Sequence, residues 1–168
     1  MKNLEIEQKY LIKDLNKVKK YIDLEKCIKI KIEQGYLSSN PTIRIRKYND
    51  EYCITYKSRA KSNSNNDIIV NKEIELPLTK DSYEHMLSKI DDNLVKKTRY
   101  KIDLLNGLIA ELDVFEGKLK GLVLVEVEFE SEEQAKLFNK PKWFGENVSS
   151  DKKYKNLFLS KVEDIQYM

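Results

Sequence analysis

The sequence has few of the residues on which thiol and histidine chemistry depends. Its two cysteines, Cys27 and Cys53, lie far apart and fit no zinc-binding or redox spacing. Cys53 falls within a predicted strand, where a packed, inert thiol is expected. The single histidine, His85, falls within a predicted helix, where we expect a surface or packing role rather than that of a base. The sequence therefore indicates a reduced, cytoplasmic setting, and no residue is marked as a covalent nucleophile.

Long apolar runs and an excess of one charge are also missing. No apolar run approaches the roughly 20 residues that span a membrane, and the N-terminus lacks the apolar core of a signal peptide. With 31 basic and 28 acidic side chains, the net charge of +3 does not favour nucleic-acid binding. We expect one globular domain over residues 1–168, without a membrane or nucleic-acid partner. The sequence leaves the oligomeric state open.

Much of the chain alternates between apolar and charged residues in the manner of β-strands. The stretch 4–10 places apolar residues on one face and Glu5, Glu7 and Lys9 on the other. The same alternation predicts strands over 28–37, 42–48, 52–57, 68–76, 95–104, 108–115 and 122–129. Pro77 is expected to end one of these strands, and Asn106-Gly107 predicts a tight hairpin.

The remaining segments predict helices and one long loop. Helical spacing of apolar residues, with capping residues before them, predicts helices over 14–21, 79–90, 131–139 and 152–159. The polar stretch 58–66 predicts a flexible loop, and we do not expect it to separate two domains because the strand pattern is the same on both sides.

One face of the predicted strands is charged almost throughout. It carries Glu5, Glu7, Lys9, Arg44, Arg46, Lys57, Glu73, Glu75, Lys97, Arg99, Glu111, Asp113, Glu126 and Glu128. A single Glu-x-Glu pair is typical of a solvated strand face, but here four acidic and two basic pairs share one inferred face. The helices need the apolar face to bury their own apolar residues. We therefore expect an antiparallel sheet that closes on itself, with helices outside and charges inside.

A charged interior requires a polar ligand. Buried acids and bases are costly unless they pair with one another and a ligand satisfies the remainder. Acid-rich strands suit a hard divalent cation such as Mg²⁺ or Mn²⁺, and base-rich strands suit phosphate oxygens. The pattern therefore favours a small phosphate-containing ligand together with a divalent metal.

The order of the motifs resembles a known family. Glu5-Ile6-Glu7-Gln8-Lys9 matches the ExExK signature of the CYTH, or triphosphate tunnel metalloenzyme, superfamily. Further matching motifs follow in order over nearly the whole chain, at residues 34–37, 43–46, 55–57, 73–77, 97–100, 111–117, 121–128, 143–146 and 154–156. The sequence is most similar to the small bacterial members that hydrolyse inorganic triphosphate.

The resemblance implies a fold and a set of site residues. It implies a β-dominated α+β fold whose core is a closed eight-stranded antiparallel barrel, or tunnel. The acidic positions associated with metal are Glu5, Glu7, Glu126 and Glu128. The positions that hold the phosphate chain are Lys9, Arg44, Arg46, Lys57, Lys97 and Arg99. Residues that would orient the bases or water are Glu73, Glu75, Glu111 and Asp113, and Lys153 is a further candidate from the C-terminal segment.

The resemblance also implies a reaction. We expect a metal-dependent hydrolase that cleaves a phosphoanhydride bond of inorganic tripolyphosphate, because nothing in the sequence marks a nucleobase pocket. One alternative is a class IV-type adenylate cyclase or a thiamine or nucleoside triphosphatase on the same fold. The other is a non-catalytic module that binds polyphosphate or a nucleotide. Such a module would need the bases but not the metal-associated acids, and the chain has both.

Overall fold

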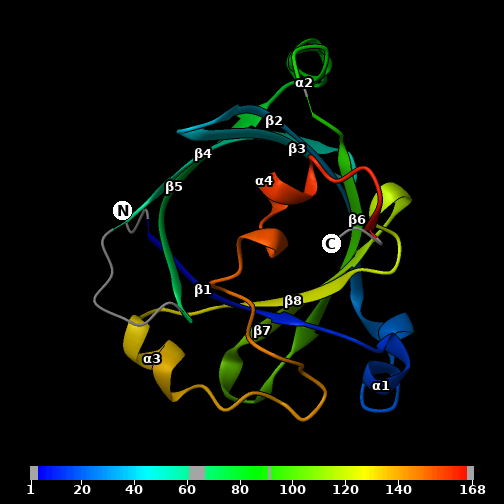
Figure 1. The fold of residues 1–168 in the computed structure, drawn as a ribbon, viewed down its shortest axis with the longest axis vertical. Coiled ribbons are helices and arrows are strands. Elements are labelled where there is room, and N and C mark those ends of the chain that lie inside the picture. Colours follow the sequence, from blue (N-terminus) through cyan, green and yellow to red (C-terminus); the bar gives the residue numbers. More distant parts are fainter. Residues whose placement is uncertain (1–3, 61–66, 91, 166–168) are drawn as a thin grey trace.

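The protein is built around a closed β-barrel. The computed structural model describes residues 4–60, 67–90 and 92–165. Eight antiparallel strands pair in the closed order β1-β5-β4-β3-β2-β6-β7-β8, as Figure 1 shows in a view along the barrel. Their bounds are β1 Leu4–Leu11, β2 Ile28–Ser39, β3 Thr42–Tyr48, β4 Glu51–Arg59, β5 Ile69–Leu78, β6 Val95–Asp103, β7 Ile109–Phe115 and β8 Val123–Glu128. The predicted closed eight-stranded barrel is confirmed.

Short helices join and cover the strands. The α-helices are α1 Leu15–Lys19, α2 Lys80–Leu87, α3 Glu132–Leu137 and α4 Asn156–Leu159, and the 3₁₀ helices are η1 Leu24–Lys26, η2 Leu105–Gly107, η3 Gly117–Leu119 and η4 Lys152–Tyr154. In Figure 1, α1, α2 and α3 lie outside the ring of strands, as expected, whereas α4 lies within its outline. No helix within the described ranges is long and apolar enough to cross a membrane.

Side-chain caps explain where the outer helices begin. The Asp14 carboxylate accepts a hydrogen bond from the Asn16 backbone N–H, and the Thr79 hydroxyl accepts one from the Ser82 N–H. Ser131 caps α3 in the same way, by accepting from the Gln134 N–H. Each of these caps satisfies a backbone donor that the helix itself leaves unpaired. The predicted helix starts are therefore confirmed, although the helices end earlier than expected.

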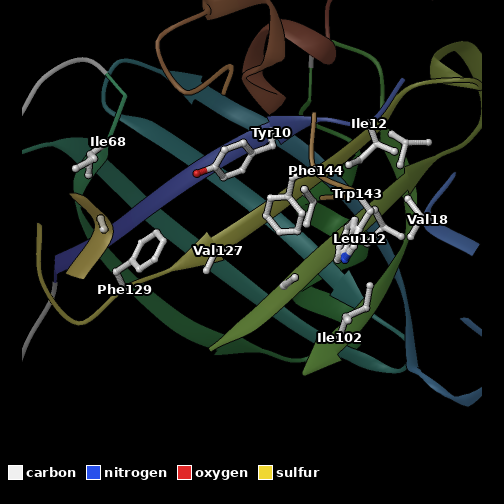
Figure 2. Close-up of a cluster of buried hydrophobic side chains, with 14 of the residues drawn as sticks. Tyr10, Ile12, Val18, Ile68, Ile102, Leu112, Val127, Phe129, Trp143 and Phe144 are labelled. Carbon is white, nitrogen blue, oxygen red and sulfur yellow. The ribbon is translucent and has the colours of Figure 1, made fainter. Parts of the chain in front are cut away.

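The main hydrophobic core lies outside the barrel. Outward-facing side chains of β1, β7 and β8, among them Tyr10, Leu112 and Val127, pack against Val18 of α1 and against Phe144 (Figure 2). Tyr10 and Phe144 form an edge-to-face ring pair with centroids 5.0 Å apart. This arrangement confirms that the apolar sheet face is turned toward covering elements, which leaves the charged face for the interior.

A second cluster fills one end of the barrel. Val95, Phe115 and Leu124 of the strands pack there with Leu159 of α4. The chain reaches this end by pairing with β1, because the Leu11 N–H donates to the Glu146 carbonyl at 3.0 Å. The two backbones lie so close that a Cβ on Gly145 would stand 2.0 Å from the Leu11 carbonyl oxygen, which explains the glycine. The last predicted helix is therefore an end closure of the barrel rather than an outer cover.

Some predicted boundaries were wrong. Ser58 and Arg59 belong to β4 rather than to the predicted loop 58–66, of which residues 61–66 lie outside the described residues. Pro77 does not end β5, which continues to Leu78, because Pro77 pairs with Cys53 at the end of the strand. The Asn106-Gly107 hairpin is confirmed, since both residues have positive φ between β6 and β7.

We predict that the outer core dominates stability. Leu112→Ala removes a side chain that is 0% exposed and should lower the free energy of unfolding by about 2–5 kcal/mol. Leu105→Ala is the matched control, because that leucine is 90% exposed, and it should change stability by less than about 0.5 kcal/mol. Urea denaturation of the two variants tests this, and similar losses from both would place the core elsewhere.

Candidate functional site

The barrel encloses a charged cavity of about 660 Å³. Alternation along each strand turns the charged residues inward, and the register aligns them across strands, with Glu7 opposite Glu128 and Lys9 opposite Glu126. The predicted site residues that line this cavity are Glu5, Glu7, Lys9, Arg44, Arg46, Lys57, Glu73, Glu75, Lys97, Arg99, Glu111, Glu126 and Glu128. Residues drawn from seven separate predicted strands thus meet in one space.

Two predicted residues lie elsewhere. Asp113 lies on the inward face of β7, opposite Arg99, but it is 1% exposed and does not line the cavity; its carboxylate pairs with Lys97 at 2.5 Å and with the Arg99 Nε at 2.6 Å. It therefore fixes the direction of two cavity cations without lining the cavity itself. Lys153 is exposed on η4 and does not line the cavity, whereas Lys155, two residues further along, does.

Two arginines on β3 form one wall of the cavity. Arg44 lies 3.4 Å from Glu73 and Arg46 lies 2.5 Å from Glu75, whose carboxylate also accepts a hydrogen bond from Thr55 at 3.1 Å. The Nε atoms of both arginines are buried without a hydrogen-bond partner. Because an unsatisfied buried donor is costly, this wall has unused capacity for an anion.

The opposite wall is an ion-pair network around Glu126. Lys9 lies 2.8 Å from this carboxylate and Arg99 lies 3.0 Å from it. Burial alone would raise the pKa of Glu126, but Lys9 and Arg99 hold it well below its usual value. Lys57 similarly forms an ion pair with Glu5. These carboxylates are therefore ionised and already committed to cations.

Glu7 and Glu128 are the uncommitted carboxylates. Among the described residues neither forms an ion pair or a side-chain hydrogen bond, although they face one another across β1 and β8. Burial raises the pKa of Glu7 to about 7, with a further contribution from Glu5 and Glu126. Burial and the charge of Glu5 likewise raise the pKa of Glu128 to about 7. This part of the cavity has an excess of negative charge that a cation would neutralise.

Lys97 differs from the other cavity cations. Burial lowers the pKa of Lys97 to about 8. The Asp113 carboxylate raises this pKa in part, but the positive charge of the adjacent Arg99 lowers it again. For Lys9, the charges of Glu126 and Glu7 outweigh burial and raise the pKa. Lys97 is therefore the cavity amine that most readily exchanges a proton near neutral pH.

Several lining residues were missed by sequence reasoning. Tyr36 and Asn71 line the cavity, as do Arg59 and Lys155. Tyr36 shares its face of β2 with Ile30 and Ile32, so the face seemed apolar, although its hydroxyl accepts a hydrogen bond from Gln34 at 3.0 Å. The alternation of 28–37 places Tyr36 on the less polar face of this strand. It would identify Tyr36 as a lining residue only if that face were known to turn inward.

The carboxylates alone do not form a complete metal site. Within the described ranges, no group of three or more histidine, cysteine, aspartate or glutamate side chains is arranged to hold a metal ion. The committed carboxylates point to lysines and arginines, and only Glu7 and Glu128 remain. A bound ion at this place would need oxygen ligands from another source.

Comparison with known proteins identifies the family. The model of the CYTH domain matches residues 3–164. The chain belongs to the CYTH family. Enzymes of this family, the triphosphate tunnel metalloenzymes, depend on a metal ion, which confirms the coarse form of the cofactor prediction.

Two CYTH relatives are similar over most of their length. An inorganic triphosphatase from Nitrosomonas europaea is 39% identical over 135 residues, which cover 78% of this chain and 84% of the relative. An inorganic triphosphatase from Acetivibrio thermocellus is 30% identical over 161 residues, which cover 94% and 93% of the two chains. The similarity therefore includes nearly every strand of the barrel.

Solved CYTH structures share the fold. The crystal structure of an inorganic triphosphatase superposes with a TM-score of 0.64 at 36% identity and covers 93% of each chain. A protein from Hippeastrum, described as a putative adenylyl cyclase with a dominant triphosphatase activity, superposes with a TM-score of 0.58 at 18% identity over 79% of this chain and 82% of that one. At that identity the second match supports the fold alone.

We predict that the two uncommitted carboxyls destabilise the metal-free protein as pH rises. Their folded pKa of about 7 exceeds the unfolded value of 4.5, so only the folded state keeps these protons between those values. Stability should therefore fall between about pH 5 and 8, a window above the range in which Glu5 and Glu126 titrate. Urea denaturation in EDTA at several pH values measures this slope.

The control for this prediction is a pair of isosteric variants. Glu7→Gln should flatten the pH dependence, because the amide cannot ionise, whereas Glu133→Gln, at an exposed position on α3, should leave it unchanged. A wild-type protein and a Glu7→Gln variant with parallel pH profiles would contradict the assignment.

Proposed function

We propose that this protein is a metal-dependent triphosphatase that hydrolyses a phosphoanhydride bond of inorganic tripolyphosphate. The observation that carries the proposal is the wall formed by Arg44 and Arg46, whose Nε atoms are buried without partners inside an enclosed cavity. A guanidinium binds phosphate oxygens through two parallel hydrogen bonds, so these orphaned donors match a phosphate chain. The names of the two bacterial relatives support the same reaction.

The uncommitted carboxylates suit the metal of such an enzyme. Mg²⁺ commonly binds through one or two carboxylates together with substrate phosphates and water, and Mn²⁺ also prefers oxygen ligands. Glu7 and Glu128 would hold the ion, with Glu5 and Glu126 beside them. When bound, a divalent ion neutralises phosphate charge and acidifies a water molecule. The substrate itself would supply the oxygen ligands that the protein lacks.

The remaining residues position the substrate. Lys9, Lys57 and Arg99 would add positive charge around the phosphates, and their carboxylate partners keep them ionised and oriented. Asp113 is a positioning residue, because it acts through Lys97 and Arg99. Glu73, Glu75 and Glu111 orient arginines in the same manner. Lys97 is the residue best suited to exchange a proton with the reacting water or the leaving phosphate.

The alternatives remain distinguishable by experiment. A cyclase must hold adenine and activate a ribose hydroxyl, and we assign no lining residue to a nucleobase pocket. A binding module would explain the basic wall but not the two spare carboxylates. We propose a cytoplasmic location because Cys27 and Cys53 are both free thiols, as is typical of a reducing compartment.

We predict that purified protein releases phosphate from tripolyphosphate when Mg²⁺ or Mn²⁺ is present. Tripolyphosphate should be preferred to ATP and thiamine triphosphate, because the cavity wall recognises phosphate rather than an organic group. EDTA should abolish the activity, and restoring the metal should recover it. Phosphate release and, separately, cyclic AMP would be measured. Absence of hydrolysis with every triphosphate would leave the binding module, and cyclic AMP as the main product would indicate a cyclase.

We predict that Arg46→Ala lowers kcat/KM by about 10²-fold or more, because it removes a donor aimed at the phosphates and leaves Glu75 without its arginine. Arg46→Lys should recover only part of this loss, since an ammonium group lacks the planar fork. Lys17→Ala, on the exposed face of α1, removes the same charge far from the cavity and should be nearly neutral. Equal, small effects from Arg46→Ala and Lys17→Ala would make the barrel interior an ordinary charged surface.

A further inference from the structure

The C-terminal segment 149–160 closes one end of the cavity. Lys9 donates from its ammonium group to the Tyr154 carbonyl at 3.3 Å, and the Asn93 N–H donates to the Ser160 carbonyl at 2.9 Å. Leu159, which is 1% exposed, anchors the segment in the apolar cluster at that end. Figure 1 shows α4 within the outline of the barrel. Lys155, Asn156 and Leu157 of this segment line the cavity, so the segment lies across this end of the barrel.

Two cations at the closed end have no carboxylate partner. Lys155, on the closing segment, and Arg59, at the end of β4, both line the cavity. Among the described residues, neither has an acidic group within ion-pair distance, in contrast to Lys9, Arg46 and Arg99. Partial burial and the nearby charges of Arg59 and Lys152 lower the pKa of Lys155. Arg59 is exposed and Lys155 is partly buried, so water screens part of the repulsion between these like charges, and a bound anion would neutralise the remainder.

Hydroxyl groups line the same end of the cavity as these two cations. Ser39 ends β2, Thr42 begins β3 and Ser58 stands beside Arg59, and all three line the cavity. The register places Thr42 opposite Lys57, at the same end as Ser58 and Arg59. A set of two unpaired cations and several hydroxyls matches the charge and the many acceptor oxygens of a terminal phosphate, which carries more charge than an internal one.

We infer that Lys155 and Arg59 bind the terminal phosphate of the substrate at the closed end of the cavity, and that this end admits only an unsubstituted phosphate. The inference rests on the proposed function for the identity of the substrate. Because the C-terminal segment lies across this end, an organic group or an additional phosphate would extend toward the opposite end of the cavity. The C-terminal segment is then a specificity element as well as an end closure.

Equilibrium binding tests the inference without requiring turnover. Isothermal titration calorimetry with tripolyphosphate in EDTA should show that Lys155→Met, which keeps most of the aliphatic stem, weakens binding by about tenfold. Lys155→Arg should bind nearly as well as the wild type, because the charge is kept. Lys161→Met is the matched control, since Lys161 directly follows the segment, is exposed and does not line the cavity. Equal dissociation constants for Lys155→Met and Lys161→Met would overturn the inference.

Kinetics separates this inference from the proposed function. With metal present, Lys155→Met should raise KM for tripolyphosphate about tenfold while kcat changes little, since ground-state binding is what the lysine contributes. The melting temperatures of Lys155→Met and Lys161→Met should agree. A lower melting temperature for Lys155→Met would indicate a purely structural role for the lysine and would overturn the inference. A wild type that binds but does not hydrolyse tripolyphosphate would refute the triphosphatase alone. A wild type that hydrolyses it, with Lys155→Met unchanged, would refute the anchor alone.

Discussion

The structure depends on one constraint, which is that a closed sheet filled with charge must neutralise that charge internally. An ion that leaves water loses several kcal/mol of hydration unless a partner restores it. The barrel meets this requirement by aligning acidic and basic residues across strands, as Lys9 and Glu126 illustrate. Each pair also fixes the direction of a cation, because a carboxylate behind Arg99 or Arg46 leaves only part of the guanidinium free. The contacts that neutralise the buried charges therefore also hold the cations in fixed directions.

Neutralisation is incomplete at two places, and their signs differ. Glu7 and Glu128 leave negative charge near β1 and β8, whereas Lys155 and Arg59 leave positive charge at the closed end. A metal bound to phosphate would neutralise the two carboxylates, and phosphate oxygens would neutralise the two cations. The charge pattern of the interior thus fits the metal–polyphosphate complex that we propose as its ligand. Binding of either component should strengthen binding of the other, because each removes repulsion that the other would meet.

The sequence allowed the barrel and most of its lining to be predicted, for a clear physical reason. Strand alternation has a period of two, so once Glu5 and Glu7 face inward, every charged pair in register follows. Thirteen predicted residues line the cavity on that basis. Two features could not be predicted in this way. Tyr36 lies on a strand whose inward face is largely apolar. Lys155 belongs to a segment without strand alternation, where Lys153 is the predicted site residue.

The pairing of β1 with β8 has a consequence for how the chain folds. β1 is the first strand in the order of the chain, yet on one edge its register partners, Leu124 to Glu128, belong to the last strand, while β5 pairs with its other edge. Closing the ring therefore requires contacts between segments separated by most of the sequence, which slows folding relative to proteins with local contacts. Until β8 pairs with β1, the Lys9 ammonium group lacks its ion-pair partner Glu126. The ion pairs that Glu126 forms with Lys9 and Arg99 therefore require the strand pairing that closes the barrel, so these two cations lose water only when their carboxylate partner is in place.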